Sequence, residues 1–528
     1  MIIDRFAKGT QFPHPNDIGR IAEYTYNEQI FDGKHGETYD RIASLLREAG
    51  NPQQSQLEKL YIAINLSQIL CLKPADLMFG EPPIYSTDKP DADPAQKGLQ
   101  RVVLENDLTT AGHSFVTALG YRGDGWLRVR LDQRHDTSGI AELGLTPPPQ
   151  TLEPLIESIN PANVFPEVTE TGGKKQFKAI NVCWVEVIPG NKIIKTQERY
   201  VLHVERHLPG YIVYRDFELV SPATVTADNG VIINTYYIGN EIPLANNIIS
   251  TGVSDFLIKH VPYVARDDDW QGSSLISQIN PLLATINDTI SQISYVLAKH
   301  ADPNMYGPDL GGDRVALGGK YIEVGKDDVA PNYMTWNAHL DLNFKLIDKL
   351  LAMVFQMAEI PQWVFGTTIT QDGGGTGTSH TDSSAIKARF FPLLSKVNRI
   401  RNNVDKALRD TLYNAQLLEQ QQARALGVDQ YEVPYPTILW RDGLPRDEKY
   451  DAEVAGLRTG GKPTLDQLGA IKYLDGVNDE QAQKIIDAIG GDDERINGTV
   501  DASIFNTPDL VDNNAFDAID DEVTAGEG

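Results

Sequence analysis

The sequence predicts an α+β fold that is mainly helical and divided into several domains. Three observations lead to this fold class: long segments in the second half carry apolar residues at helical spacing, residues 126–219 alternate apolar and polar side chains, and glycines and prolines separate the segments. The chain has 528 residues, which is enough for about three to four domains of roughly 100–200 residues each.

Composition and charge argue against several classes of protein. No apolar run approaches the ~18 residues of a transmembrane helix, and the first residues lack the pattern of a signal peptide, so we expect a cytoplasmic origin and no membrane partner. The formal net charge of −26 argues against tight binding of nucleic acid over the whole surface. It is compatible with a wall past which DNA slides, because like charges repel. Cys71 and Cys183 lie in apolar stretches and are expected to be buried free thiols.

The first half of the chain, residues 1–270, combines helices with a β region. Apolar spacing indicates helices before Gly50 and again up to Pro74, where proline is expected to break the helix. Residues 86–98 are a polar, proline-containing linker. The alternation in 126–219, with turn signals such as Asn229-Gly230 beyond it, predicts antiparallel strands with one face exposed.

Two amphipathic helices flank a compact insert in the second half. In residues 271–300 the apolar positions step by three or four, and Pro281 either kinks one continuous helix or opens a new one after Asn280. Residues 337–360 repeat these steps and stop before Pro361. Glycines punctuate short strands in 301–336, so the whole predicts a helical hairpin with a small β-containing domain at its tip.

A glycine-rich loop, 361–384, leads into a third and very long helix, 385–427. The basic residues of this helix, from Lys387 to Arg409, do not fall on one stripe, so they indicate a solvated face or subunit contacts as readily as DNA contact. Shorter helices are expected in 428–495, the last ending at Gly490-Gly491. Residues 496–528 are acidic and are expected to be disordered.

No motif assembles a convincing active site. The run GGGTGTS lacks the lysine of a phosphate-binding loop and follows a helix rather than a strand. His203, Glu205 and His207 would share one side of a strand and could chelate a metal, although a polar solvent face is the plainer interpretation. We therefore predict no catalytic residue, no cofactor and no enzyme activity.

Four stretches carry a resemblance to a known family: INLSQILCLKPADLMFGEPP, GSSLISQINPLLATINDTIS, SSAIKARFFPLLSKVNRIRNNVDKAL and ILWRDGLPRDEKYDAEVAGLRTGGKPTLDQLGAIKYLDGVNDEQAQKI. In this order, with the segments described above, the chain resembles the portal proteins of tailed double-stranded DNA bacteriophages. Each stretch is weak alone, and their order and spacing carry the resemblance. The resemblance implies a portal-like arrangement: a wing (1–270), a two-helix stem (271–300 and 337–360), a clip (301–336), a channel or tunnel loop (361–384), a long wing and crown helix (385–427) and a helical crown (428–495).

The resemblance also implies a function. Such proteins form a ring, usually of twelve subunits, at one capsid vertex of the virion, and are assembled in the host cytoplasm. They conduct DNA during terminase-driven packaging and during ejection, and they connect head to tail. Expected partners are copies of the chain, double-stranded DNA, the terminase large subunit, the major capsid and scaffolding proteins, and the head-completion or tail adaptor protein. No active site is required, because terminase hydrolyses the ATP.

The resemblance assigns residues to four roles. Lys345 and Lys349 are expected to face DNA in the stem. The channel loop comprises Thr370, Gln371, Asp372, Gly373, Gly374, Gly375, Thr376, Gly377, Thr378, Ser379 and His380. Stem residues expected to pack between subunits are Leu282, Ile286, Ile290, Ile293, Phe344, Ile347, Leu351 and Val354. Clip residues expected to bind terminase or the adaptor are Asp313, Arg314, Lys320, Tyr321 and Lys326.

Two other functions remain open from the sequence. One is a metal-dependent hydrolase that uses His203, Glu205 and His207. The other is a capsid adaptor or scaffold protein that has no channel.

Overall fold

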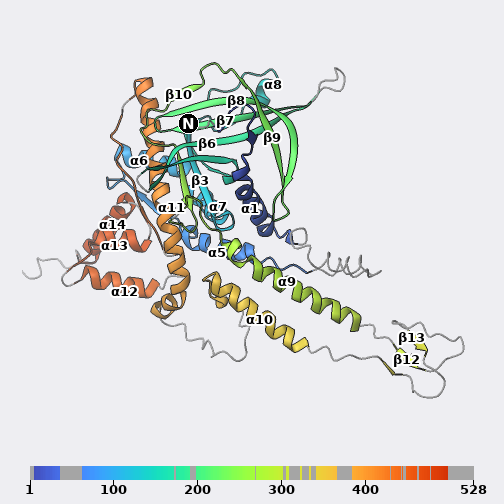
Figure 1. The fold of residues 1–528 in the computed structure, drawn as a ribbon. Helices are drawn as coiled ribbons and strands as arrows, with labels where there is room; N and C mark the ends of the chain where they lie inside the picture. Colours follow the sequence, from blue (N-terminus) through green and yellow to red (C-terminus); the bar gives the residue numbers. More distant parts are fainter. Residues whose placement is uncertain are drawn as a thin grey trace, which may run out of the picture. The chain divides into compact units, whose positions relative to one another are not determined.

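The computed structural model divides into two compact units, Met1–Pro445 and Arg446–Gly528, which are described separately (Figure 1). The described residues are 5–35, 62–171, 174–190, 198–267, 269–300, 305–307, 321–323, 332–333, 340–365, 383–428, 430–441, 443, 448–460, 463–475, 477 and 479–497.

A large, curved antiparallel sheet forms the β-rich part of the first unit (Figure 1). Its strand order is β1-β9-β8-β7-β6-β5, and β10 also pairs with β8. The strands are β1 (Gln11–Phe12), β5 (Val164–Thr171), β6 (Lys174–Ile188), β7 (Arg199–Leu208), β8 (Tyr211–Thr226), β9 (Ile232–Ile242) and β10 (Ile248–Ser250). One face packs on α1 (Pro15–Phe31), where Leu202, Phe217 and Ile21 share a core.

The predicted fold class, a mainly helical chain with a portal-like arrangement, is wrong, because this sheet is a major layer of the molecule. The sequence pattern underestimated the strands for a physical reason. Bulges shift the register in β8 after Phe217 and again after Val220, and Ser221 takes a positive φ of 53°. Each extra residue inverts the alternation of faces, so a strand of 16 residues reads as a shorter one.

A second, three-stranded antiparallel sheet has the order β11-β3-β4. Its strands are β3 (Asp124–Asp132), β4 (Glu153–Ile159) and β11 (Ile258–Pro262). β4 is an edge strand, and the Asn106 side chain accepts from Ile156 N (2.9 Å) and donates to Pro154 O (3.0 Å). The Asn106 side chain therefore hydrogen-bonds backbone groups of β4 that could otherwise pair with another strand.

Smaller elements complete the first unit. They are β2 (Ile84–Ser86) paired with β15 (Thr437–Leu439), β12 (Met305–Gly307) with β13 (Tyr321–Glu323) and β14 (Asn332–Tyr333), the helices α5 (Leu66–Phe79), α6 (Pro94–Glu105), α7 (Leu108–Arg122) and α8 (Ser138–Glu142), and the 3-10 turns η1 (Pro161–Asn163) and η2 (Gln362–Phe365). The predicted break at Pro74 is wrong, because α5 continues through it. Cys71 on α5 and Cys183 on β6 are buried free thiols, as predicted.

Three long helices form the rest of the first unit: α9 (Leu275–His300), α10 (Leu340–Met357) and α11 (Ser383–Leu426). Pro281 lies inside one continuous α9, which decides between the two alternatives for this proline. The three helices share one core with α5 and α7, to which Ile279, Val354 and Val397 contribute.

The second unit is helical, with α12 (Glu448–Thr459), α13 (Gln467–Asp475) and α14 (Asp479–Asn497). The prediction that the last helix ends at Gly490-Gly491 is wrong, because α14 continues through both glycines. Among the described residues, no helix in either unit is long and apolar enough to cross a membrane.

Candidate assembly and nucleic-acid interface

The base of α9 is fixed by a buried carboxylate, Asp124, which is 1% exposed at the start of β3. It accepts hydrogen bonds from Tyr24 Oη (2.6 Å), His260 Nε2 (2.8 Å) and the Gly272 backbone N–H (2.8 Å). Burial, and then the charge of Asp124, raises the pKa of Tyr24 well above its usual value, so the phenol keeps its proton and donates. The Asp124 carboxylate therefore joins helix α1, strand β11 and the turn before α9.

The turn beside Asp124 depends on glycine. Gly123 has φ +90° as the C-cap of α7, and a Cβ there would lie 2.8 Å from Ser274 N. Its carbonyl accepts from Tyr263 N (2.8 Å). The backbone before α9 therefore approaches the end of α7 more closely than any side chain permits.

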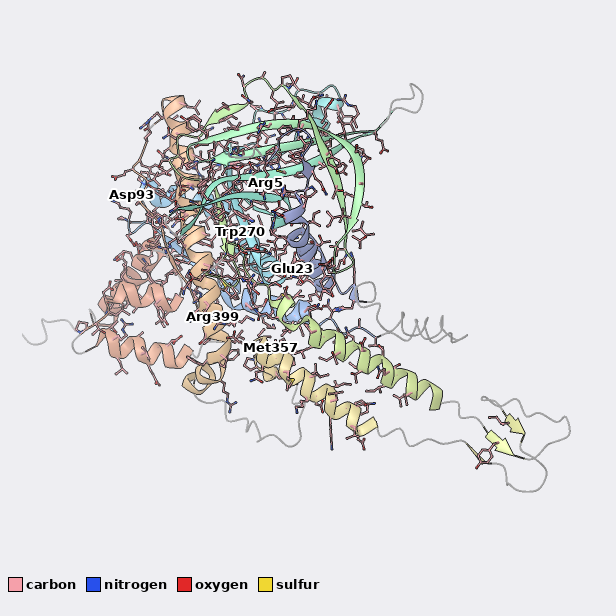
Figure 2. All side chains as sticks on the ribbon, in the orientation of Figure 1. Arg5, Glu23, Asp93, Trp270, Met357 and Arg399 are labelled. Atoms are coloured by element: carbon pink, nitrogen blue, oxygen red, sulfur yellow. The ribbon has the colours of Figure 1, made fainter. Side chains whose placement is uncertain are left out.

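Polar side chains join α1 to the first turn of α9. Ser274 Oγ accepts from Ser277 N (2.9 Å), which caps the helix, and Asn27 Nδ2 donates to both serine hydroxyls at 3.1 Å. Ser277 Oγ donates to Glu23 (2.7 Å), which is labelled on α1 in Figure 2. These contacts attach α9 firmly to the body of the unit.

Most of the stem residues expected to pack between subunits are buried or half-buried within a single chain. Ile286, Ile293, Ile347 and Val354 are buried, at 1%, 5%, 9% and 0% exposed. Leu282, Ile290 and Leu351 are half-buried against the same core, whereas Phe344 is 51% exposed. One apolar face of α10 is thus covered by its own chain, and the predicted contact between subunits stays a prediction.

A second apolar face of α10 is exposed. Leu342, Leu346, Met353 and Met357 are 67%, 45%, 42% and 46% exposed. Their positions step by four, seven and four residues, which places all four side chains on one side of the helix. We call these four residues the α10 stripe; Met357 is labelled in Figure 2. An exposed apolar row of this kind on a well-anchored helix is typical of a protein-binding surface.

The exposed face of α9 carries few charges. Between 278 and 292, all of them described residues, the most exposed side chains are Gln278, Pro281, Thr285 and Gln292, and the half-buried Asp288 is the charged group beside them. Helix faces that stay in water usually carry more charged residues. A face with few charges is desolvated at lower cost than a fully charged one.

Lys345 and Lys349 lie on the exposed side of α10, next to the α10 stripe. They are four residues apart and therefore share one side of the helix. Both side chains are exposed, and their contact with phosphates stays a prediction.

The end of α10 is held by two cations of α11. Lys396, 4% exposed, donates to Ala358 O (2.7 Å) and lies 5.6 Å from the ring centroid of Tyr263. Arg399, which is labelled in Figure 2, pairs with Glu359. Burial lowers the pKa of Lys396 to about 8. Cations at a helix C-terminus complement its dipole, so α10 and α11 are joined rigidly.

Other basic residues of α11 bind neighbouring groups of the same chain. Arg409 pairs with Asp405 (2.7 Å), Lys406 with Asp410 (3.7 Å), and Arg401 donates to Arg441 O (3.0 Å). The first two pairs lie within α11 and the third joins it to Arg441, which agrees with the absence of a single basic stripe in the sequence.

Several predicted site residues lie outside the described residues. These are all eleven channel-loop residues from Thr370 to His380, and the clip residues Asp313, Arg314, Lys320 and Lys326. The acidic segment from 498 onward lies outside them as well. Tyr321 is the first residue of β13.

His203, Glu205 and His207 lie on one face of β7, as their spacing predicts, but they bind different partners. His203 Nδ1 bonds Asp216 and Nε2 bonds Glu186, both at 2.9 Å. Glu205 bonds Arg128 (2.6 Å) and His207 (2.8 Å). Both ring nitrogens of His203 are therefore engaged, and among the described residues no three His, Cys, Asp or Glu side chains are placed to hold a metal ion.

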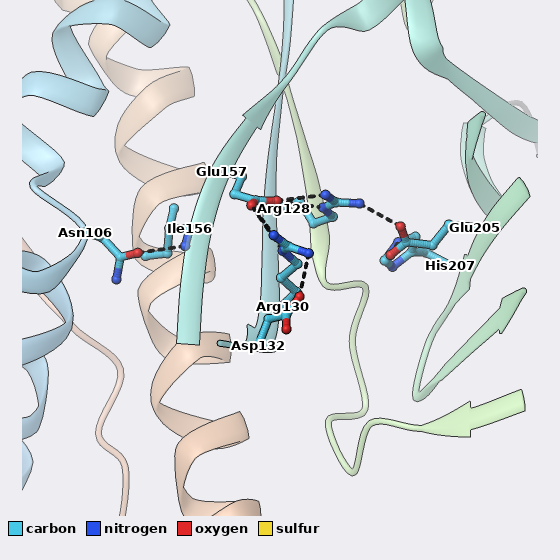
Figure 3. Close-up of polar contacts among 8 residues, drawn as sticks. All are labelled: Asn106, Arg128, Arg130, Asp132, Ile156, Glu157, Glu205 and His207. Atoms are coloured by element: carbon cyan, nitrogen blue, oxygen red, sulfur yellow. Dashed lines mark hydrogen bonds and ion pairs between the residues drawn. The ribbon is translucent and has the colours of Figure 1, made fainter. Parts of the chain in front are cut away.

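Sequence reasoning missed an ionic network between the two sheets (Figure 3). Arg128 on β3 reaches Glu205 on β7 (2.6 Å) and Glu157 on β4 (2.7 Å), while Arg130 binds Glu157 and Asp132. The alternating WLRVRLD pattern does place both arginines on one strand. Their partners lie 29 and 77 residues away from Arg128, so local spacing could not identify them.

Comparisons with known proteins establish no family for this chain. No family model matches it, and no protein with curated annotation matches it. A chain in a solved structure titled "Virion of native gene transfer agent (GTA) particle" is similar over 81% of this chain and 94% of its own length, with 12% sequence identity and a TM-score of 0.38. A likeness of that size carries no argument about function.

Proposed function

We propose that this chain is a portal protein, a structural subunit that closes into a ring at one capsid vertex and conducts double-stranded DNA. The observation that carries the proposal is the second apolar face of α10. The order of the sequence segments supports it, because it resembles the order in that family.

The two exposed faces complement each other across copies of the chain. The α10 stripe is apolar and the α9 face carries only the half-buried charge of Asp288, so one subunit can place its α10 against the α9 of the next. Such a contact uses two different surfaces and is heterologous, and a heterologous contact repeated with a closing rotation makes a ring.

The charge of the chain suits a conduit for DNA. With −26 charges per subunit, most of the ring repels phosphate and leaves the polymer free to slide. Lys345 and Lys349 on α10 would supply a narrow basic belt. Terminase, the capsid and scaffolding proteins and the tail adaptor are the partners that this role requires, and the chain itself needs no catalysis.

A double substitution in the α10 stripe tests the assembly. Leu346→Glu with Met353→Glu places charges where a neighbour would pack, and both side chains are exposed in the single chain, so the subunit should still fold. We expect wild-type rings of about a dozen subunits, as the resemblance implies, and monomers from the variant. Light scattering gives the mass, and negative-stain images show whether the particle has a central hole.

The matched control is Leu104→Glu on α6, where the side chain is 77% exposed and lies outside both faces. It should assemble like the wild type. Rings of normal yield from the double variant would refute the role of the α10 stripe. A wild-type dimer or tetramer without a hole would refute the portal function itself. Leu351, an apparent choice from the sequence, is less suitable because it packs in the core of its own chain.

The lysine pair can be tested on assembled rings with a short DNA duplex. Replacing Lys345 and Lys349 with alanine should weaken binding, and the slope of log affinity against log salt should fall by about 1 for each lysine that contacts a phosphate. Lys406→Ala on α11 is the control, because its side chain is 75% exposed and pairs with Asp410. An unchanged slope in the double variant would remove these lysines from the DNA path.

A further inference from the structure

The face of the large sheet opposite α1 presents an ordered row of side chains. Strand pairing places Trp184 on β6 opposite His203 on β7, and His203 opposite Asp216 on β8. The indole stacks on the His203 ring, with centroids 5.3 Å apart and an angle of 22° between the ring planes. Trp184 is nevertheless 44% exposed, so a large aromatic surface remains open to solvent.

Two hollows flank this row and meet at Trp184. The larger, of about 1010 Å³, lies between the two sheets and the end of α11. The smaller, of about 350 Å³, is bounded by the loop 244–247. Trp184 and Tyr214 line both hollows, so the two adjoin, and we call the pair the Trp184 cleft.

The Trp184 cleft is acidic. Glu186 and Asp216 each use one oxygen to hold His203, which leaves each carboxylate a second oxygen that can accept from a ligand. The guanidinium groups of Arg128 and Arg130 are already paired with carboxylates. The carboxylates on its walls, which are Asp132, Glu157, Glu205 and Asp216, outnumber these two guanidinium groups, and Glu186 adds a further carboxylate beside His203.

We propose that the Trp184 cleft is a docking site for a basic segment of a partner protein, an extended stretch with an arginine or lysine beside apolar residues. The cation would lie on the open face of Trp184, where the ring quadrupole attracts it, within reach of Glu186 and Asp216. The apolar neighbours would fill the hollow beside Leu244. This inference is independent of the proposed ring, because the cleft belongs to a single chain.

The test measures fluorescence anisotropy with a labelled peptide of alternating leucine and arginine, capped at both ends. Trp184→Ala should weaken binding at least fivefold without changing the charge of the protein, and a peptide with citrulline in place of arginine should bind equally weakly to both forms. The control is Tyr211→Ala, because Tyr211 is 51% exposed on the opposite face of the sheet. Physiological salt limits general attraction to an acidic protein.

Each outcome decides the proposal. Selective loss with Trp184→Ala, together with dependence on the arginine charge, supports it. Equal binding to wild type and Trp184→Ala overturns it, because general charge then accounts for the affinity. It is also overturned if Trp184→Ala weakens self-association of the chain in light scattering, since a second copy is then the occupant. Circular dichroism of the variant confirms that the exposed substitution leaves the fold intact.

Discussion

Replacing Asp124 with alanine should destabilise the first unit by about 3–5 kcal/mol, because three buried donors lose their acceptor at roughly 1–3 kcal/mol each. The variant leaves the donors of Tyr24, His260 and Gly272 without their acceptor in a site from which water is excluded. The base of α9 should loosen as well, because the Gly272 contact fixes the turn before it. Chemical denaturation gives the free energy of unfolding.

Asp124→Asn separates charge from shape. Asparagine keeps one accepting oxygen and the size of the side chain, so we expect a smaller loss than with alanine. Protease cleavage near the start of α9 should increase in the alanine variant and much less in the asparagine variant. Equal stability of wild type and Asp124→Ala would show that this contact point does not hold α9.

Removing the guanidinium that joins the two sheets should have the second-largest effect. Arg128→Ala leaves Glu205, which is 5% exposed, with His207 as its remaining partner, and should cost about 3 kcal/mol. Arg199→Ala is the control, because its pair with Glu218 is mostly exposed and should contribute less than about 1 kcal/mol. Unfolding free energies of the three proteins at neutral pH test this order.

The loss of unfolding free energy caused by Arg128→Ala should become smaller as the pH falls. Burial raises the pKa of Glu205, but His207 and Arg128 outweigh it and hold the pKa below its ordinary value of 4.5. A carboxylate with a lowered pKa stabilises the fold above the unfolded pKa and loses that contribution as the pH falls through the folded one. The difference between wild type and variant should therefore shrink below about pH 4.5. A difference that is constant down to pH 3 would exclude this pair as its source.

Much of the helical part of the fold follows from the local sequence pattern, with two exceptions. Apolar steps of three and four predict helices where α9, α10 and α11 lie. Pro74 and the pair Gly490-Gly491 were expected to end helices and do not. Pro74 is buried among core residues of α5, so tertiary packing compensates for the hydrogen bond that proline cannot make. Gly490 and Gly491 lower helix propensity by about 1 kcal/mol each, which does not suffice to end α14.

The candidate surfaces were less predictable than the helices. The family resemblance assigns Ile286, Ile347 and Val354 to contacts between subunits, and within the single chain these side chains are buried. The exposed side chains Leu346 and Met353 belong to the α10 stripe, a second apolar row beside the buried apolar face of the same helix. Nothing in the spacing of one helix indicates which of two apolar faces its own chain will cover.

The amino-acid order was sufficient for the features that depend on neighbours in the chain: helix periods, the side of β7 that carries His203, and the overall negative charge. Tertiary structure alone decided the features that join distant segments. Asp124 meets groups 100, 136 and 148 residues away, and Arg128 reaches Glu205 across 77 residues. The physical reason is that periodicity arises from backbone geometry within a few residues, whereas these contacts depend on which faces the closed chain brings together.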